Sequence, residues 1–269
     1  MKQSDAERSA FSVMTYNIRV DTSYDKNDSW SYRRDALNAI VGFYDPDLFC
    51  AQEALPHQLA DLKRMTQYTP VAYGRDDGES SGEHAAIFCR TGRFEVLRSG
   101  SFWLSPTPDV PSFGWESRHR RMATWANLHD LQSGKRFVIV CTHLDHEFVD
   151  ARVNGAGVLI ERLAAIADGK PVILVGDFNE NPDGPGVQAV LREFQDSRAV
   201  CELPAIGPNG TFNGFDVTNV SPADRIDYIF VKGDIRVIRQ ANLVTITPEG
   251  KLPSDHFPAY AEIGLAPNL

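Results

Sequence analysis

The stretch that decides the fold reads Val172-Ile173-Leu174-Val175-Gly176-Asp177-Phe178-Asn179. Its first four residues are all apolar, which predicts a strand that is covered on both faces. Two polar side chains, Asp177 and Asn179, follow where the apolar run stops. The stretch therefore predicts a buried strand that brings polar groups to one edge of a sheet.

The same arrangement recurs along the chain. Three more apolar runs end in polar residues: Phe11–Met14 before Asn17, Leu48–Ala51 before Glu53, and Phe137–Cys141 before His143. Two later strands begin with such residues, Asp227 and the pair Asp255-His256. If the first four strands are parallel and the last two antiparallel, these groups meet at one sheet edge, where open α/β sheets bind ligands. We expect convergence of Asn17, Glu53, His143, Asp177, Asn179, Asp227, Asp255 and His256.

Turn formation is the simpler explanation for any one of these residues, because Asp and Asn often follow strands. It accounts well for Asp183-Gly184 but poorly for Glu53 and His143, which are not turn formers. Six strands that carry a polar group at the same edge favour a functional site.

Short apolar runs alternate with helical patterns along the whole chain. The helix Val149–Ala167 has the clearest amphipathic spacing. We expect one α/β domain over residues 11–265, preceded by a polar tail over 1–10, with two packed mixed β-sheets flanked by helices. The other predicted helices are Tyr32–Tyr44, His57–Thr66 and Gly186–Phe194. The predicted strands are Phe11–Ile18, Asp47–Gln52, Ala85–Arg90, Phe94–Leu104, Met122–Leu131, Phe137–His143, Val172–Gly176, Ile226–Val231, Val237–Ile246 and Phe257–Ile263.

Composition narrows the function classes. The chain has 269 residues, of which 42% are hydrophobic and 23% charged, which excludes intrinsic disorder. No apolar stretch of about 18 residues is present, so we expect no membrane span. With 27 basic and 36 acidic residues the net charge is −9, which argues against a duplex-DNA binder.

The cysteines and the N-terminus bear on the compartment. Three of the four cysteines, Cys50, Cys89 and Cys141, lie in apolar runs, as free buried thiols do in reducing compartments. Residues 1–10 lack the apolar segment of a signal peptide. We therefore expect a cytoplasmic protein, although a chain whose signal peptide has been removed would look the same.

The side chains expected at the sheet edge suit a hard cation. Carboxylates and amides without thiolates favour Mg²⁺ or Mn²⁺ over zinc. Zinc would need His143 and His146 together, but residues three apart on a strand point to opposite faces. A bound Mg²⁺ polarises a phosphoryl oxygen, and a histidine beside a carboxylate accepts a proton from water. His256 with Asp227 or Asp177 fits this second role.

Six sequence blocks resemble the endonuclease/exonuclease/phosphatase superfamily, which has the DNase I-like fold. They follow the family order and extend from Tyr16 to His256. The resemblance implies a four-layer α/β/β/α sandwich and metal-dependent hydrolysis of phosphoesters. The blocks are Tyr16-Asn17-Ile18-Arg19, Gln52-Glu53, Thr142-His143-Leu144-Asp145-His146, Gly176-Asp177-Phe178-Asn179, Arg225-Ile226-Asp227-Tyr228-Ile229 and Ser254-Asp255-His256.

The resemblance also implies roles for the metal-binding residues. Glu53 would be the main Mg²⁺ ligand, with Asn17 beside it. Asp255 would complete the metal and phosphate environment. The metal would be Mg²⁺, or Mn²⁺ as an alternative.

The catalytic roles follow from the same resemblance. Asp177 would orient or deprotonate the attacking water, and Asn179 would hold the phosphate or that water. His256, oriented by Asp227, would act as a base or stabilise the transition state; which of His256 and Asp177 takes the proton stays open. His143 would contact a phosphate oxygen.

Four further stretches resemble a bacterial branch of this superfamily with nocturnin-like and deadenylase-like features: Tyr73-Gly74-Arg75-Asp76-Asp77-Gly78, Gly82-Glu83, Phe102-Trp103-Leu104-Ser105 and Arg121-Met122-Ala123-Thr124-Trp125. Arg121 leads into a strand and is expected to contact phosphate. Arg75 and Glu83 flank the loop Asp76–Gly82, where Glu83 binds a polar substrate or only pairs with Arg75. Trp115, in the Pro-rich loop Ser105–Ser117, is the first candidate to stack on a substrate. Phe212 and Phe215 come next.

These observations favour a Mg²⁺-dependent hydrolase of a small phosphorylated substrate. A nuclease acting on DNA or RNA is the first alternative, and the net charge of −9 weighs against it. A catalytically inactive binding module is the second, and the presence of every expected ligand type weighs against it. The oligomeric state is not predicted.

Overall fold

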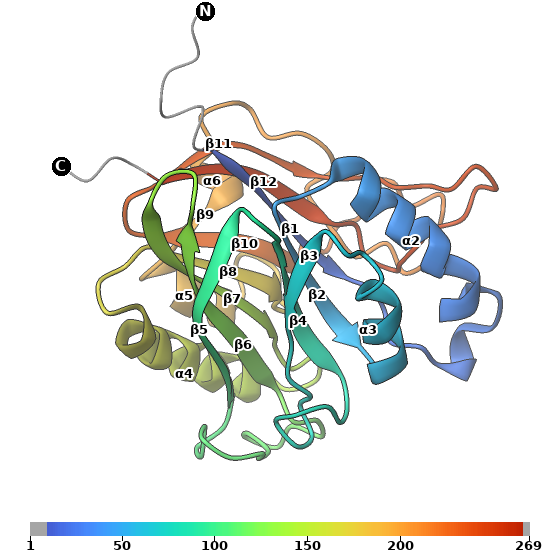
Figure 1. The fold of residues 1–269 in the computed structure, drawn as a ribbon. Coiled ribbons are helices and arrows are strands. Elements are labelled where there is room, and N and C mark those ends of the chain that lie inside the picture. Colours follow the sequence, from blue (N-terminus) through green and yellow to red (C-terminus); the bar gives the residue numbers. More distant parts are fainter. Residues whose placement is uncertain (1–9, 266–269) are drawn as a thin grey trace, which may run out of the picture.

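The computed structural model describes residues 10–265, in which two six-stranded sheets pack face to face (Figure 1). The first sheet has the strand order β11-β12-β1-β2-β4-β3 and the second β5-β6-β7-β8-β10-β9. The first contains β1 (Phe11–Asn17), β2 (Leu48–Ala54), β3 (Tyr68–Val71), β4 (His84–Arg90), β11 (Ile235–Asn242) and β12 (Ala259–Leu265). The second contains β5 (Phe94–Trp103), β6 (Met122–Asp130), β7 (Lys135–His143), β8 (Val172–Asp177), β9 (Gln195–Asp196) and β10 (Asp227–Lys232).

Helices cover the outer faces of both sheets (Figure 1). The helices α2 (Trp30–Tyr44) and α3 (Pro56–Leu62) pack Leu37 and Leu59 against the first sheet. On the other side, α4 (Val149–Ala167) and α5 (Pro185–Leu191) pack Leu159 and Val187 against the second. A short 3-10 helix, η1 (Ser23–Asp28), and α6 (Ser197–Val200) complete the elements. The predicted four-layer α/β/β/α sandwich is confirmed.

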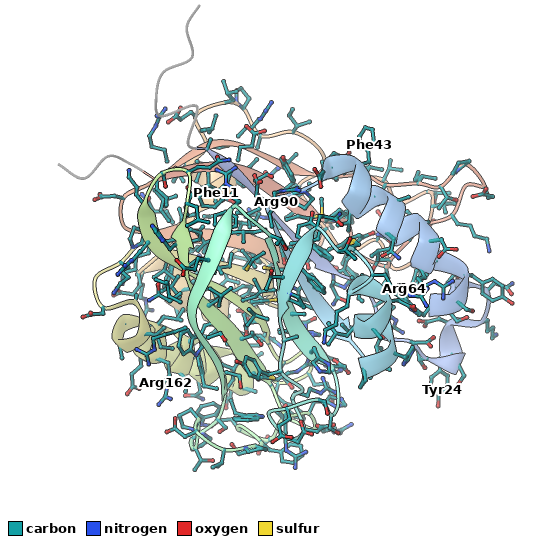
Figure 2. The ribbon with its side chains drawn as sticks, in the orientation of Figure 1. Phe11, Tyr24, Phe43, Arg64, Arg90 and Arg162 are labelled. Carbon is teal, nitrogen blue, oxygen red and sulfur yellow. The ribbon has the colours of Figure 1, made fainter. Side chains whose placement is uncertain are left out.

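The central core lies between the two sheets. Phe11 from β1 stacks on Phe137 from β7, with ring centroids 5.1 Å apart. Figure 2 places Phe11 inside the molecule, whereas Tyr24 and Phe43 point outward. Cys50, Cys89 and Cys141 are buried in this core as free thiols. No helix in residues 10–265 is long and apolar enough to cross a membrane.

Strand direction brings the polar strand ends together. The pairs β1–β2 and β7–β8 are parallel, and β8–β10 is antiparallel. The register therefore places Asp177 of β8 opposite both His143 of β7 and Asp227 of β10. The predicted combination of parallel and antiparallel strands is confirmed for these pairs.

A close approach of backbones fixes β8 against β7 at this edge. Gly176 has a φ of +145°, and a Cβ atom built there would lie 2.0 Å from the Thr142 carbonyl oxygen. Only glycine fits this position without a shift of the backbone. The glycine therefore sets how closely Asp177 and His143 approach each other.

Most predicted elements are found, and the differences have local causes. The helix Val149–Ala167 has the predicted bounds, and the expected strand 237–246 is β11, which ends at Asn242. Strand β3 was not predicted because Pro70 cannot donate a ladder hydrogen bond; β3 lies at the sheet edge, where proline is tolerated. The strand β9 and the helices η1 and α6 are too short to leave a periodic pattern. Most of the expected tail 1–10 lies outside the described residues.

Candidate active site

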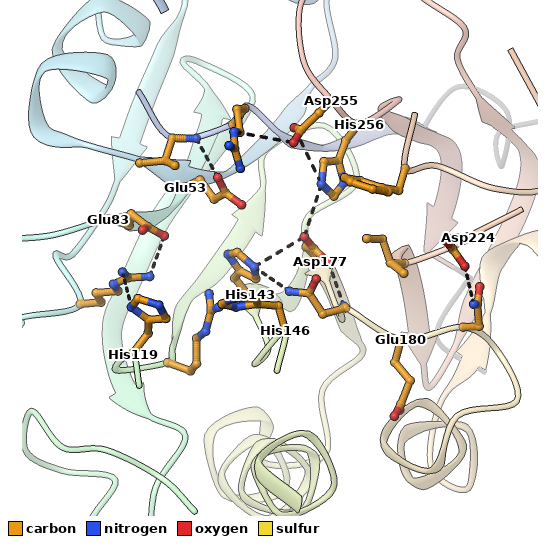
Figure 3. Close-up of a pocket in the computed structure, with 18 residues that line it drawn as sticks. Glu53, Glu83, His119, His143, His146, Asp177, Glu180, Asp224, Asp255 and His256 are labelled. Atoms are coloured by element: carbon orange, nitrogen blue, oxygen red, sulfur yellow. Dashed lines mark hydrogen bonds and ion pairs between the residues drawn. The ribbon is translucent and has the colours of Figure 1, made fainter. Parts of the chain in front are cut away.

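An open cavity of about 580 Å³ lies at the edge where β1, β2, β7 and β8 end. Both sheets contribute side chains to it, and Figure 3 shows these side chains directed into one space. The lining residues include Glu53, Arg75, Glu83, Arg121, His143, Asp177, Asn179, Asp255 and His256 from the sequence prediction. The buried Asn17 and Asp227 lie directly behind this lining, in contact with Glu53 and His256.

Asn17 links the two sheets beneath the cavity. Its Nδ2 atom donates to Glu53 Oε1 at 2.8 Å and to Asp177 Oδ2 at 2.9 Å. The second oxygen of Glu53 accepts a hydrogen bond from the Val20 amide at 2.7 Å. Burial alone would raise the pKa of Glu53, but these donors, with the charge of His256, hold it below its ordinary value. Glu53 is therefore a half-buried, ionised carboxylate.

The backbone at Glu53 is strained. Its φ is +65°, and the pairing of β2 with β4 shifts register between Ala51 and Ala54. Such bulges bend a strand and redirect a side chain, and they are frequent next to active sites. The bulge directs Glu53 into the cavity at the end of β2.

His256 and Asp227 form a buried pair at the floor of the cavity. His256 Nδ1 lies 2.8 Å from Asp227 Oδ2. Burial would lower the pKa of His256, but the charge and hydrogen bond of Asp227, with the charge of Asp177, raise it well above its ordinary value. The opposite ring atom, Nε2, lies 3.8 Å from Asp177 Oδ2. The imidazolium form is therefore favoured at this position.

Asp177 lies at the centre of the group. Its burial, with the charge of Asp227, raises its pKa to about 7. Its Oδ1 atom accepts the Asn179 amide at 2.8 Å, in a turn where Asn179 has a φ of +50°. A carboxylate whose pKa lies near neutrality can exchange a proton under ordinary conditions.

His143 and Asn179 contact each other beside Asp177. Asn179 Nδ2 donates to His143 Nε2 at 2.9 Å, and that nitrogen lies 3.5 Å from Asp177 Oδ2. Burial and the charges of Arg121 and Arg75 lower the pKa of His143 well below its usual range. His143 is therefore neutral and accepts a hydrogen bond at Nε2.

The carboxylates at the upper side of the cavity fit a divalent cation. Ligand atoms of Glu53, His143 and Asp177 all lie within 4.8 Å of one another. Burial and the charge of Glu53 together raise the pKa of Asp255. A cation bound near the two carboxylates would lower that pKa again. His143 and His146 belong to different clusters of potential ligand atoms. The donor set is thus rich in oxygen, as Mg²⁺ and Mn²⁺ require.

A second group of residues lines the other side of the cavity. Arg75 Nη1 lies 2.6 Å from Glu83 Oε2, so the ion pair considered in the sequence is present. Arg121 is 6% exposed, and its Nη2 donates to His146 Nδ1 at 2.8 Å. Figure 3 shows Glu83 and His119 on this side.

Trp115 lies elsewhere. It is not among the residues that line the cavity in the described part of the chain. Its loop packs back on the end of β5, where a Cβ atom on Gly114 would lie 2.4 Å from the Leu104 carbonyl oxygen. Phe212, the second candidate, does line the cavity, and its ring lies 5.2 Å from that of His256.

Sequence reasoning missed several lining residues. Arg19 holds Asp25 and lies 3.7 Å from Asp255 Oδ2. His119 lies within the run Arg118-His119-Arg120-Arg121, of which only Arg121 was predicted to contact the substrate. His146 was considered only as a zinc ligand together with His143. The sequence block around Asn17 includes Arg19, and this was the one available signal for it.

Comparison with known proteins identifies the family. The sequence model of the Endonuclease/Exonuclease/phosphatase family matches residues 14–256. The chain belongs to this family. Its resemblance to that superfamily, predicted from the six sequence blocks, is confirmed, and so is the class of enzyme: family members hydrolyse phosphoesters with the help of a divalent metal.

Two solved structures from Bacteroides thetaiotaomicron are closely similar. One is an endonuclease/exonuclease/phosphatase family protein with 35% identity and a TM-score of 0.90, covering 96% of this chain and 98% of that one. The other is a mannosyl-6-phosphatase with 36% identity and a TM-score of 0.88, covering 94% and 99%.

A curated relative adds a nuclease to the comparison. The CCR4-Not complex 3'-5'-exoribonuclease subunit Ccr4 of Emericella nidulans is 22% identical over 351 residues. The match covers 94% of this chain and 52% of the relative, so the chain spans about half of that protein's length. The relatives thus include both a phosphatase and a nuclease.

Proposed function

We propose that this family member is a Mg²⁺-dependent hydrolase of a small phosphorylated substrate. The observation that carries the proposal is that Glu53 and Asp177, from the ends of β2 and β8, and His256, from the segment before β12, line one cavity. Glu53 and Asp255, with Asn17 beside them, would hold the metal. When bound, Mg²⁺ supplies positive charge that polarises a phosphoryl oxygen.

Two side chains of the protein have different roles in proton transfer: one donates a hydrogen bond and the other accepts a proton. Asp227 keeps His256 protonated, so His256 Nε2 is a donor suited to charge that develops on phosphate oxygens. Asp177, with its pKa near 7, accepts the proton of the attacking water. Asn179 holds that water or a phosphate oxygen, next to His143. Arg121, whose buried Nε has no hydrogen-bond partner among the described residues, contacts the phosphate.

The shape and charge of the cavity support a small substrate. Its volume of about 580 Å³ falls within the range of small-molecule sites. Of the cationic side chains that line it, Arg75 is paired with Glu83, and Arg121 lies 3.9 Å from Asp145 Oδ2. The similarity to a mannosyl-6-phosphatase points the same way. The similarity to Ccr4 makes a nuclease the second candidate.

A substrate panel tests the proposal. Phosphomonoesters, phosphodiesters, single-stranded RNA and plasmid DNA are incubated with Mg²⁺ or Mn²⁺, and Asp177→Asn is the control. We expect metal-dependent hydrolysis of small phosphoesters that Asp177→Asn loses. Efficient cleavage of RNA or DNA with no turnover of small esters would favour the nuclease instead.

A further inference from the structure

The cavity extends from the reaction centre to a wall that the proposed chemistry does not use. Glu83, His119 and His146 form this wall, and Figure 3 shows Glu83 and His119 on the opposite side from Asp224, with Asp177 between. The rings of His119 and His146 stack with centroids 5.6 Å apart. A group attached to the phosphate would meet this wall.

The loop next to Glu83 is held by its own hydrogen bonds. Asp77 Oδ1 accepts three backbone amides within it, those of Glu79, Ser80 and Ser81. The Trp103 indole donates to the Arg75 carbonyl oxygen at 2.8 Å. The wall is therefore built before a ligand arrives, which lowers the entropic cost of binding.

Two arginines determine which ring nitrogen of each histidine carries the hydrogen. Arg121 Nη2 lies 2.8 Å from His146 Nδ1, and Arg75 Nη2 lies 3.4 Å from His119 Nδ1. A guanidinium has donors only and stays charged, so each Nδ1 must accept. Each neutral imidazole then carries its hydrogen on Nε2. Burial, with the nearby arginine charges, lowers the pKa of both histidines, which agrees with the neutral form.

The Nε2–H tautomers of these two histidines make metal binding at this wall unfavourable. Potential ligand atoms of His119, His146 and Glu147 lie within 4.8 Å of one another. Metal binding through Nε2 would move the hydrogen to Nδ1, where an arginine N–H already points. The wall therefore combines neutral N–H donors with an acceptor, the Glu83 carboxylate; Nε2 of His146 also lies 3.5 Å from Glu147 Oε1.

Donors and acceptors side by side match hydroxyl groups, since a hydroxyl both donates and accepts. A nucleobase would need an aromatic platform, and Phe212, at the His256 side, is the only Phe, Tyr or Trp lining the cavity in residues 10–265. We infer that Glu83, His119 and His146 form a hydroxyl-binding subsite, and that the substrate is a sugar phosphate. This inference rests on the proposed phosphoester hydrolysis. Arg75 and Arg121 act on the subsite as positioning residues.

Matched substrates and variants test the subsite. We compare kcat/KM for a panel of hexose and pentose phosphates with that for n-hexyl phosphate, which lacks hydroxyls. In His119→Phe and His146→Phe, the ratio of the best sugar phosphate to hexyl phosphate should fall about tenfold, the usual cost of one lost hydrogen bond. His119→Gln replaces His119→Phe if the larger side chain disturbs folding. His129→Phe is the control, because His129 lies on β6 against Glu95.

The positioning role of the two arginines is tested separately, through the tautomers of the histidines. Nitrogen-15 NMR should show His119 and His146 as neutral Nε2–H tautomers, and Arg75→Met should abolish this preference at His119. An unchanged substrate ratio in both histidine variants, a wild type that prefers hexyl phosphate, an Nδ1–H tautomer, or Zn²⁺ bound through both Nε2 atoms would each overturn the subsite. Failure of the wild type to hydrolyse any ester would instead refute the proposed function, and the subsite with it.

Discussion

His256 Nδ1 lies 2.8 Å from Asp227 Oδ2, and both side chains are buried. This contact joins the start of β10, in the second sheet, to the segment that leads into β12 of the first sheet. The carboxylate fixes the orientation of the ring and stabilises its cation. It leaves Nε2 directed towards Asp177.

Removal of this pair should lower turnover without unfolding the protein. We expect His256→Ala to reduce kcat by roughly 10²–10⁴-fold, the usual range for a group that acts on protons. Asp227→Asn should lose a large part of the same factor, because the cation is no longer stabilised. Steady-state kinetics with circular dichroism as a folding control measure both. Near-normal kcat in Asp227→Asn would show that the pair has no catalytic role.

Glu53 should determine metal affinity. It is the carboxylate that Asn17 and the Val20 amide keep ionised at the end of β2. Glu53→Ala should weaken Mn²⁺ or Mg²⁺ binding by more than about 100-fold, beyond the loss typical of residues that only support a ligand. Isothermal titration calorimetry measures the affinity, and Glu79→Ala, in an exposed loop, is the control. Equal affinity in the two variants would place the metal elsewhere.

The pH dependence of stability follows from two pKa values that are raised in the fold. Burial beside Asp227 raises the pKa of Asp177 from 3.8 to about 7, and Asp227 raises that of His256. The folded protein therefore binds more protons than the unfolded chain. The Asp177 contribution to stability is full below about pH 4 and is lost as the pH rises through 7.

Metal-free wild type in a chelator should thus lose stability relative to Asp177→Asn between pH 4 and 7. The difference in free energy of unfolding should change by at most about 1.4 kcal/mol per pH unit. Urea denaturation at each pH measures it. Parallel stability curves for the two proteins would contradict the raised pKa of Asp177.

The sequence predicted which polar residues meet in the cavity because strand ends have a fixed geometry. The parallel strands β7 and β8 stop at one edge and so bring His143 and Asp177 together, and the packing of the two sheets adds Asn17 from β1. The wall at His119 could not be predicted in this way. Its contact with Arg75 joins loops 44 residues apart, and neither residue ends a regular strand. The bulge at Glu53 was also invisible, since alternation of side chains gives no signal for one extra residue.

Salt dependence should separate a small substrate from a nucleic acid. The net charge is −9, and the loop beside the cavity carries Asp76, Asp77 and Glu79, which repel a polyphosphate backbone. Arg120 is not available to attract a phosphate backbone to this loop, because its Nη1 lies 3.5 Å from Asp76 Oδ1 and is paired with it.

A nuclease with six to ten phosphate contacts would lose about 10³-fold or more in affinity between 50 and 200 mM salt. We expect only a shallow change in kcat/KM for a small phosphoester over this range, and no efficient nicking of supercoiled plasmid DNA. Agarose gels and a phosphate-release assay at matched ionic strength measure the two activities. Strong nicking that falls steeply with salt, present in the wild type and lost in Asp177→Asn, would show that the cavity admits a polymer. The acidic loop would then have to move away from the path of the backbone.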